Sequence, residues 1–218
     1  MRGSTLINLF IDTSRRSLSV ALTDGNNIIV KKNIESYSKH SNYLMNTLND
    51  MFKENNLKPS DIDNIIVLNG PGSFTGVRVG VTVAKTIAWT LSKKLYLLTT
   101  LQALKLHASN DVVISVFFDK NTSSYVGIYD EEDTIGYMNI DDEKLNIVNK
   151  NITIVSYDEN EYVLNLENKL KASNNVSLKI IDDYDYVKLV NYALTKENVN
   201  VHLATPIYLK KIDAETKL

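Results

Sequence analysis

The chain contains no cysteine, and its 218 residues include only three histidines, three prolines and eight glycines. The absence of cysteine excludes disulfides, thiolate catalysis and cysteine-based metal sites, and it fits a reduced, intracellular setting. The histidines His40, His107 and His202 form no pair at metal-ligand spacing, and no HExxH motif occurs. A metalloprotease is therefore not expected.

Long apolar runs and strong charge are also missing. The first apolar segment, Leu6–Ile11, is interrupted by Asn8 and is far too short for a signal sequence or a membrane-spanning helix. A net charge of −2 argues against independent tight binding to nucleic acid, and only Arg15-Arg16 and Lys210-Lys211 hint at a basic patch. We expect a cytoplasmic protein, without a membrane association, that folds as one large domain or two small ones.

The few glycines and prolines are concentrated in residues 69–80. This segment directly follows an apolar run and holds four of the eight glycines and one of the three prolines: Gly70, Pro71, Gly72, Gly76 and Gly80. A strand that ends in such a loop before a long apolar segment predicts a strand–loop–helix joint. Joints of this kind often receive an anion or a close-packed partner.

The spacing in this glycine segment excludes three familiar loops. In a dinucleotide fingerprint the third glycine comes three residues after the second, but Gly76 comes four after Gly72. A Walker loop needs a lysine directly after its last glycine, and the nearest lysine is Lys85. A hydrolase elbow needs glycine two residues before its serine, where Pro71 precedes Ser73.

Hydrophobic periodicity predicts an alternation of strands and helices in each half of the chain. The first half is predicted to hold strands at 6–12, 18–23, 28–34, 62–68 and 95–99, and helices at 41–55, 75–91 and 102–109. The second half is predicted to hold strands at 112–118, 125–129, 134–138, 152–156 and 176–181, and helices at 160–172 and 184–194.

Residues 75–91 satisfy two patterns at once. Val77, Val79, Val81 and Val83 alternate as in a strand, whereas apolar residues also recur at helical spacing through Ala88. The segment is longer than a typical strand, so we predict a helix. With that choice the order of elements nearly repeats. We predict an α/β protein of two ribonuclease-H-like lobes, residues 1–109 and 110–218, with the second lobe reduced. Such a pair of lobes flanks the nucleotide cleft in proteins of the actin-like ATPase superfamily.

Several segments together resemble the bacterial TsaB (YeaZ) family. They are residues 11–14, 18–22, 40–41, 70–80 with 84–85, and 206–210. The resemblance is dense over residues 6–108 and thin over 112–200. It implies the actin-like nucleotidyl-cleft fold and a role in forming threonylcarbamoyladenosine in tRNA, on the adenine beside the anticodon.

The resemblance also implies separate roles for TsaB and its partner proteins. The paralogue TsaD is the catalytic transferase, TsaE is an ATPase that joins the TsaB–TsaD pair, and TsaB is a non-catalytic scaffold that often forms a homodimer when alone. ATP and metal are then expected on the partner proteins, with no cofactor on this chain and only indirect contact with tRNA. TsaD carries a His-x-x-x-His metal pair after its glycine segment, whereas residues 99–107 here contain a single histidine and no carboxylate.

Two sets of candidate site residues follow. The first is a partner interface on the helices 41–55 and 75–91, made by Tyr43, Met45, Leu48, Gly76, Val77, Gly80, Val81 and Ala84. Gly76, Gly80 and Ala84 are spaced by four, so on a helix they form a small-residue strip that admits close approach by another helix. Tight packing of the same strip on the chain's own sheet is an equal alternative.

The second set is Asp12, Thr13 and Ser14, directly after the first strand. In actin-like folds this position faces the nucleotide phosphates, so these residues are candidates for a residual nucleotide contact; a capped turn explains the same residues. Two other function classes stay open. One is a nucleotide-binding enzyme of the actin-like superfamily, a phosphotransferase or a glycoprotease-type peptidase. The other is a dimeric structural protein with no link to tRNA.

Overall fold

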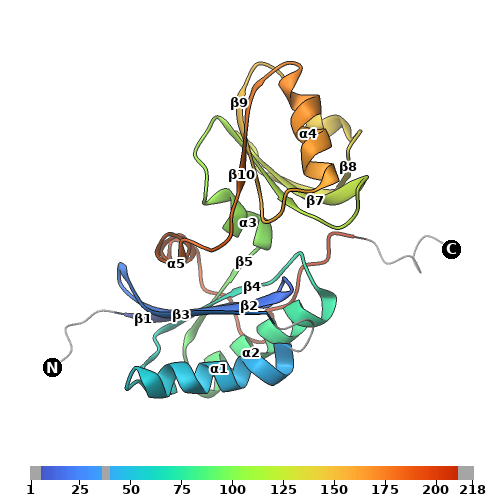
Figure 1. The fold of residues 1–218 in the computed structure, drawn as a ribbon. Coiled ribbons are helices and arrows are strands. Elements are labelled where there is room, and N and C mark those ends of the chain that lie inside the picture. The colour runs from blue at the N-terminus through green and yellow to red at the C-terminus, as the bar shows by residue number, and fades with distance from the viewer. Residues whose placement is uncertain (1–5, 36–39, 211–218) are drawn as a thin grey trace. The chain divides into compact units, whose positions relative to one another are not determined.

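A computed structural model describes residues 6–35 and 40–210 of the chain, except the side chain of His40. The chain divides into two compact units, each built on one five-stranded sheet (Figure 1). The first unit comprises Met1–Thr99 and Asp185–Ile207, and the second comprises Thr100–Tyr184 and Tyr208–Leu218. No helix among the described residues is long and apolar enough to cross a membrane.

The sheet of the first unit is mixed, with the strand order β3-β2-β1-β4-β5. Its strands are β1 (Ile7–Asp12), β2 (Ser17–Asp24), β3 (Asn27–Glu35), β4 (Asn64–Leu68) and β5 (Lys94–Leu98). The first three form an antiparallel meander, and β4 and β5 run parallel to β1. Every residue of β1 and β4 is buried, as expected for central strands that are covered on both faces.

Helices cover both faces of this sheet (Figure 1). The helices α1 (His40–Glu54) and α2 (Phe74–Thr90) pack on one face and contact each other, and α5 (Tyr186–Leu194) packs on the other. Side chains of β1 alternate accordingly: Leu9 and Ile11 join the core under α1 and α2, whereas the ring of Phe10 lies 5.6 Å from the ring of Tyr186 in α5.

The second unit repeats the sheet with the order β10-β9-β6-β7-β8. Its strands are β6 (Val112–Phe117), β7 (Ser123–Tyr129), β8 (Thr134–Asn139), β9 (Asn151–Ser156) and β10 (Asn175–Ile180). Again the first three are antiparallel and the last two run parallel to the first. One face is covered by α4 (Glu161–Lys171) and the other by α3 (Thr100–Lys105).

The predicted architecture is confirmed, including the helix over most of 75–91 and the reduced second lobe. Between β3 and β4 the first unit carries the fifteen-residue helix α1. At the equivalent place between β8 and β9 the second unit has only the three-residue 3₁₀ helix Glu143–Leu145. A further 3₁₀ turn, Pro59–Asp61, precedes β4.

The predicted division at residue 109 differs from the division in the structure at two places. Although α3 follows β5 of the first unit along the chain, its Leu101 and Leu104 pack with Val113 and Tyr129 of the second sheet. Residues 185–207 return to the first unit, where Ala204 is buried in the core and Val199 N–H donates to Leu95 O at 2.8 Å. The prediction followed chain order, so it assigned α3 to the first lobe and residues 185–207 to the second.

The end of the described chain is attached to the second unit by a three-residue polar cluster. Lys210 Nζ lies 2.9 Å from Asp119 Oδ2, which also accepts a hydrogen bond of 2.6 Å from the Tyr137 hydroxyl. Partial burial opposes ionisation of Asp119, but the hydrogen bonds from Tyr137 and Lys210 outweigh it and lower the pKa of the carboxyl group.

Replacing Asp119 by asparagine should therefore reduce the free energy of unfolding of the second unit by about 1 kcal/mol at pH 7, because the change removes the charge that two donors share. A carboxyl whose pKa is lowered by folding stabilises above its ordinary value of 3.8, and the effect is lost as the pH falls through the folded value. Hydrogen exchange of β6–β8 amides should show the difference at pH 7 and not in strong acid. Asp158→Asn, an exposed position, is the matched control; equal losses in the two variants would contradict the assignment.

Candidate functional site

The turn after β1 and the glycine segment are joined inside the first unit. Thr13 Oγ1 donates to the Gly76 carbonyl at 2.7 Å, and Ser73 N–H donates to the Ser14 carbonyl at 2.7 Å. A Cβ atom on Gly72 would lie 2.5 Å from that Ser14 carbonyl oxygen. Only glycine therefore allows the two segments to approach this closely.

Asp12 is fully buried in the same turn. One of its carboxylate oxygens accepts the Ser14 N–H at 2.7 Å, and the other lies 3.5 Å from Nε of Arg15. Arg15 in turn donates to Ser19 Oγ at 3.0 Å. Asp12, Thr13 and Ser14 therefore form a capped turn that contacts the chain's own glycine segment, and the nucleotide contact stays a prediction. The Ser14 Oγ is buried and has no hydrogen-bond partner among the described residues.

The start of the glycine segment is held by the returning C-terminal segment. Asn69 N–H donates to Leu98 O at 2.9 Å, its carbonyl accepts the Ile207 N–H at 2.8 Å, and its Nδ2 donates to Thr205 O at 3.2 Å. Gly70 follows with a φ of 101°, and a Cβ there would lie 3.1 Å from the Ile207 carbonyl oxygen. The loop is therefore fixed by contacts with β5 and with residues 205–207.

The small-residue strip of α2 does not form an exposed surface. Gly76, Gly80 and Ala84 are buried within the first unit, and a Cβ atom on Gly80 would overlap the hydroxyl oxygen of Thr13. Val77 and Val81 are also buried, as is Leu48 of α1. These six residues are buried within the first unit, so the structure favours the intramolecular alternative for them, and a partner interface at these positions stays a prediction. The small size of Gly76, Gly80 and Ala84 lets α2 pack closely against the end of β1 in the same chain.

Only Tyr43 and Met45 of the predicted interface are exposed, with 42% and 52% of their surface accessible. Phe74, at the first position of α2, is 51% exposed and was not predicted. The guanidinium carbon of Arg78 lies 3.7 Å from the centre of its ring. The i, i+4 spacing of Phe74 and Arg78 is a sequence signal for this pairing. We call Tyr43, Met45, Phe74 and Arg78 the outer surface of α1 and α2.

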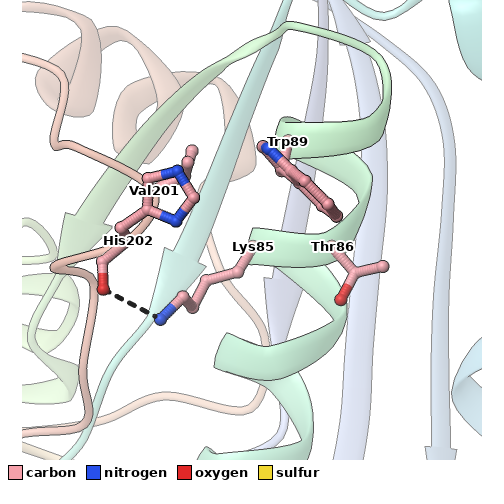
Figure 2. A pocket seen from close by; sticks show the side chains of 5 residues that line it. All are labelled: Lys85, Thr86, Trp89, Val201 and His202. Atoms are coloured by element: carbon pink, nitrogen blue, oxygen red, sulfur yellow. Dashed lines mark hydrogen bonds between the residues drawn. The ribbon is translucent and has the colours of Figure 1, made fainter.

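A pocket of about 260 Å³ lies beside the C-terminal half of α2 (Figure 2). Five residues line it: Lys85, Thr86, Trp89, Val201 and His202. Trp89 is 64% exposed, its ring centre lies 6.3 Å from that of His202, and Lys85 Nζ donates to the His202 carbonyl at 3.4 Å. Sequence reasoning missed this pocket because residues 201–202 were assigned to the other lobe; the one tryptophan of the chain was the available signal.

The other candidate residues lie apart. His107 is in the second unit, with its ring centre 6.3 Å from that of Tyr184, and the His40 side chain lies outside the described residues. Within the described part of the chain, no three histidine, aspartate or glutamate side chains gather in a group that could hold a metal ion.

Comparison with known proteins finds relatives in sequence and in fold. The family model of TsaD, tRNA N6-adenosine threonylcarbamoyltransferase, matches residues 33–127. The tRNA threonylcarbamoyladenosine biosynthesis protein TsaB of Bacillus subtilis is 27% identical over 96% of this chain and 96% of its own length. TsaB of Buchnera aphidicola is 35% identical, over 37% of this chain and 36% of its own.

Among solved structures, YeaZ from Pseudomonas aeruginosa superposes with a TM-score of 0.71 at 19% identity, covering 94% of this chain and all of its own. This likeness shows a common fold, the ribonuclease-H-like arrangement predicted from the order of elements. The likeness in sequence to TsaB extends over nearly the whole of both chains. In sequence this chain is similar to the TsaB proteins, and in fold it is similar to YeaZ.

Proposed function

We propose that this chain takes part in forming threonylcarbamoyladenosine in tRNA, as a non-catalytic subunit that binds the TsaD transferase. The observation that carries the proposal is the nearly full-length likeness to TsaB of Bacillus subtilis, whose name states that pathway. The match of residues 33–127 to the TsaD family model supports a paralogous relationship between the two proteins.

The contacts of the turn after β1 support a non-catalytic role. At the position that faces phosphates in nucleotide-binding relatives of this fold, both carboxylate oxygens of Asp12 are engaged within the turn, by Ser14 N–H and by Arg15. The Thr13 hydroxyl donates to the start of α2. These polar groups hold the glycine segment in place, which is a structural task.

The outer surface of α1 and α2 is the contact that we propose for TsaD. Exposed aromatic residues, methionine and arginine are enriched in the centres of protein interfaces, and this surface offers all three in Tyr43, Phe74, Met45 and Arg78. A specific interface should bury on the order of 1,000 Å² or more. A second copy of the chain occupies the same surface when TsaD is absent, TsaE joins the TsaB–TsaD pair, and ATP and metal bind to the partners.

Expression of this chain, together with TsaD from the same source, should restore threonylcarbamoyladenosine in Bacillus subtilis cells depleted of their own TsaB. The readout is the modified nucleoside in digested tRNA, measured by liquid chromatography and mass spectrometry. Unchanged depletion, with the chain present at normal levels, would refute the proposed pathway.

The Ser14→Ala variant, tested in the same cells, distinguishes a scaffold role of this chain from a catalytic role. Its hydroxyl is buried without a described partner, so removing it should cost little stability. A scaffold should keep full modification with Ser14→Ala. Loss of the modification by a variant that still folds and binds TsaD would assign chemistry to this turn.

A further inference from the structure

The pocket beside α2 presents an aromatic face and an ammonium group at the same place. Lys85 and Trp89 are one helical turn apart and project from the same side of α2, toward His202 (Figure 2). Trp89 leaves 64% of its surface accessible although its ring meets that of His202 at an interplanar angle of 66°. A large exposed indole is a surface on which a planar ring can stack.

The sequence segments that line this pocket carry more positive than negative charge. Residues 74–94 contain Arg78, Lys85, Lys93 and Lys94 and no acidic residue, and residues 199–207 contain no Asp, Glu, Lys or Arg. This is a local excess of positive charge in a chain whose net charge is −2. Attraction of an anion is therefore favoured here.

The negative end of the helix dipole does not cancel this charge. The terminal carbonyls of α2 accept backbone donors from the following turn: Ile87 O from Leu91 N–H, Ala88 O from Lys93 N–H at 2.8 Å, and Trp89 O from Ser92 N–H. Lys85 itself lies a full turn before these carbonyls. One of its three ammonium donors points to the His202 carbonyl, which leaves two for a ligand.

The size of the pocket limits the ligand. A volume of about 260 Å³ is below the usual range for drug-sized molecules, and it suits a single ring system with one attached anionic group. A nucleotide has this composition: a planar base for the indole and a phosphate for Lys85 and the imidazole of His202. An acidic peptide would use the lysine but would leave the exposed indole without a matching planar group.

We propose that this pocket holds one unpaired nucleotide of an RNA strand, with its base against Trp89 and its phosphate at Lys85 and His202. The inference rests on the proposed function, because a tRNA is the substrate of that reaction. Single-stranded loops present splayed bases that stack on aromatic side chains. A single stacked base and one or two phosphate contacts position the strand.

Trp89 is the one tryptophan of the chain, so its fluorescence reports on this pocket directly. We expect saturable quenching of this emission in about 50 mM salt by an RNA hairpin with the sequence of a tRNA anticodon arm. A fully paired RNA duplex of the same length should quench several-fold less, because its bases are not available for stacking. AMP serves to distinguish a free nucleotide from an RNA-bound one.

Variants test the two halves of the proposed contact by anisotropy of the labelled hairpin. Trp89→Ala should weaken binding about tenfold, as expected for loss of one stacked base. Lys85→Gln should reduce the slope of log K against log salt by about 1. Lys188→Gln removes an equal charge from an exposed position on α5, on the opposite face of the sheet, and should change neither quantity.

Several results would overturn the inference. They are absence of quenching at saturating hairpin, equal quenching by the duplex, tighter binding of AMP than of the hairpin, or unchanged affinity in Trp89→Ala. A fluorescence change caused by purified TsaD or TsaE without RNA would assign the pocket to a protein partner instead. Restored threonylcarbamoyladenosine in cells, combined with any of these results, would leave the proposed function standing while this inference fails.

Discussion

Replacing Gly80 by alanine is expected to destabilise the first unit by about 2 kcal/mol, although the same change usually stabilises a helix by about 1 kcal/mol. The reason is the contact between α2 and the end of β1, where a Cβ atom on Gly80 would overlap Thr13 Oγ1. Rotating the Thr13 side chain gives little relief, because its Cβ and Cγ2 would lie 3.4 and 3.5 Å from the new atom. Rotation would also break the hydrogen bond from Thr13 to Gly76 O.

Urea unfolding followed by Trp89 emission measures this effect in the first unit alone, since the second unit has no tryptophan. Gly136→Ala lies in the second unit, where a Cβ atom would make ordinary contacts of 3.5 and 3.8 Å with the Met138 side chain, so it should leave this transition unchanged. A Thr13→Ala/Gly80→Ala double variant should lose less than the sum of the single changes, with a coupling of about 1 kcal/mol or more. Additive losses would show that the two residues do not meet in solution.

Changing Met45 and Phe74 together to glutamate should weaken binding to TsaD at least about 100-fold while leaving the stability of the chain nearly unchanged. Both side chains are about half exposed, so new charges there meet water in the isolated chain and an apolar partner in the complex. Two central interface residues commonly account for about 2 kcal/mol or more each, which corresponds to about 30-fold per residue.

The measurement is the dissociation constant of the purified pair by calorimetry, with Val148→Glu as the control. Val148 is an exposed apolar residue of the second unit, at 57% accessibility, so this variant introduces a glutamate at an unrelated place. Val148→Glu is expected to bind TsaD normally. If the Met45→Glu/Phe74→Glu variant bound TsaD with unchanged affinity, the partner surface would lie elsewhere than on the outer surface of α1 and α2.

The glycine segment shows what a local sequence pattern can predict about a structure and what it cannot. Clustering of Gly70, Gly72, Gly76 and Gly80 after an apolar run was sufficient to predict a special strand–loop–helix joint and to exclude three phosphate loops by spacing. The same pattern could not show what each glycine approaches. Thr13, Ser14 and Ile207, the residues that require glycine at these positions, lie tens of residues or more away along the chain.

The sequence pattern also could not predict which side chains are exposed to solvent. A small residue at every fourth position favours close approach to a neighbouring segment. The pattern does not distinguish a sheet of the same chain from a helix of another protein. The structure shows the former for Gly76, Gly80 and Ala84, and it leaves Phe74 and Trp89 accessible instead. The Trp89 pocket needs His202, which reaches α2 only because residues 185–207 return to the first unit.

Hydrophobic periodicity, turn residues and one dense motif were enough to predict the element order, the doubled sheet and the resemblance to TsaB, because each of these depends on residues that are close in sequence. The identity of the accessible side chains, the division into units and the contacts of the turn after β1 depend on packing between segments far apart in the chain. Burial is a property of the neighbours that a residue acquires on folding, and those neighbours are not encoded in its local spacing.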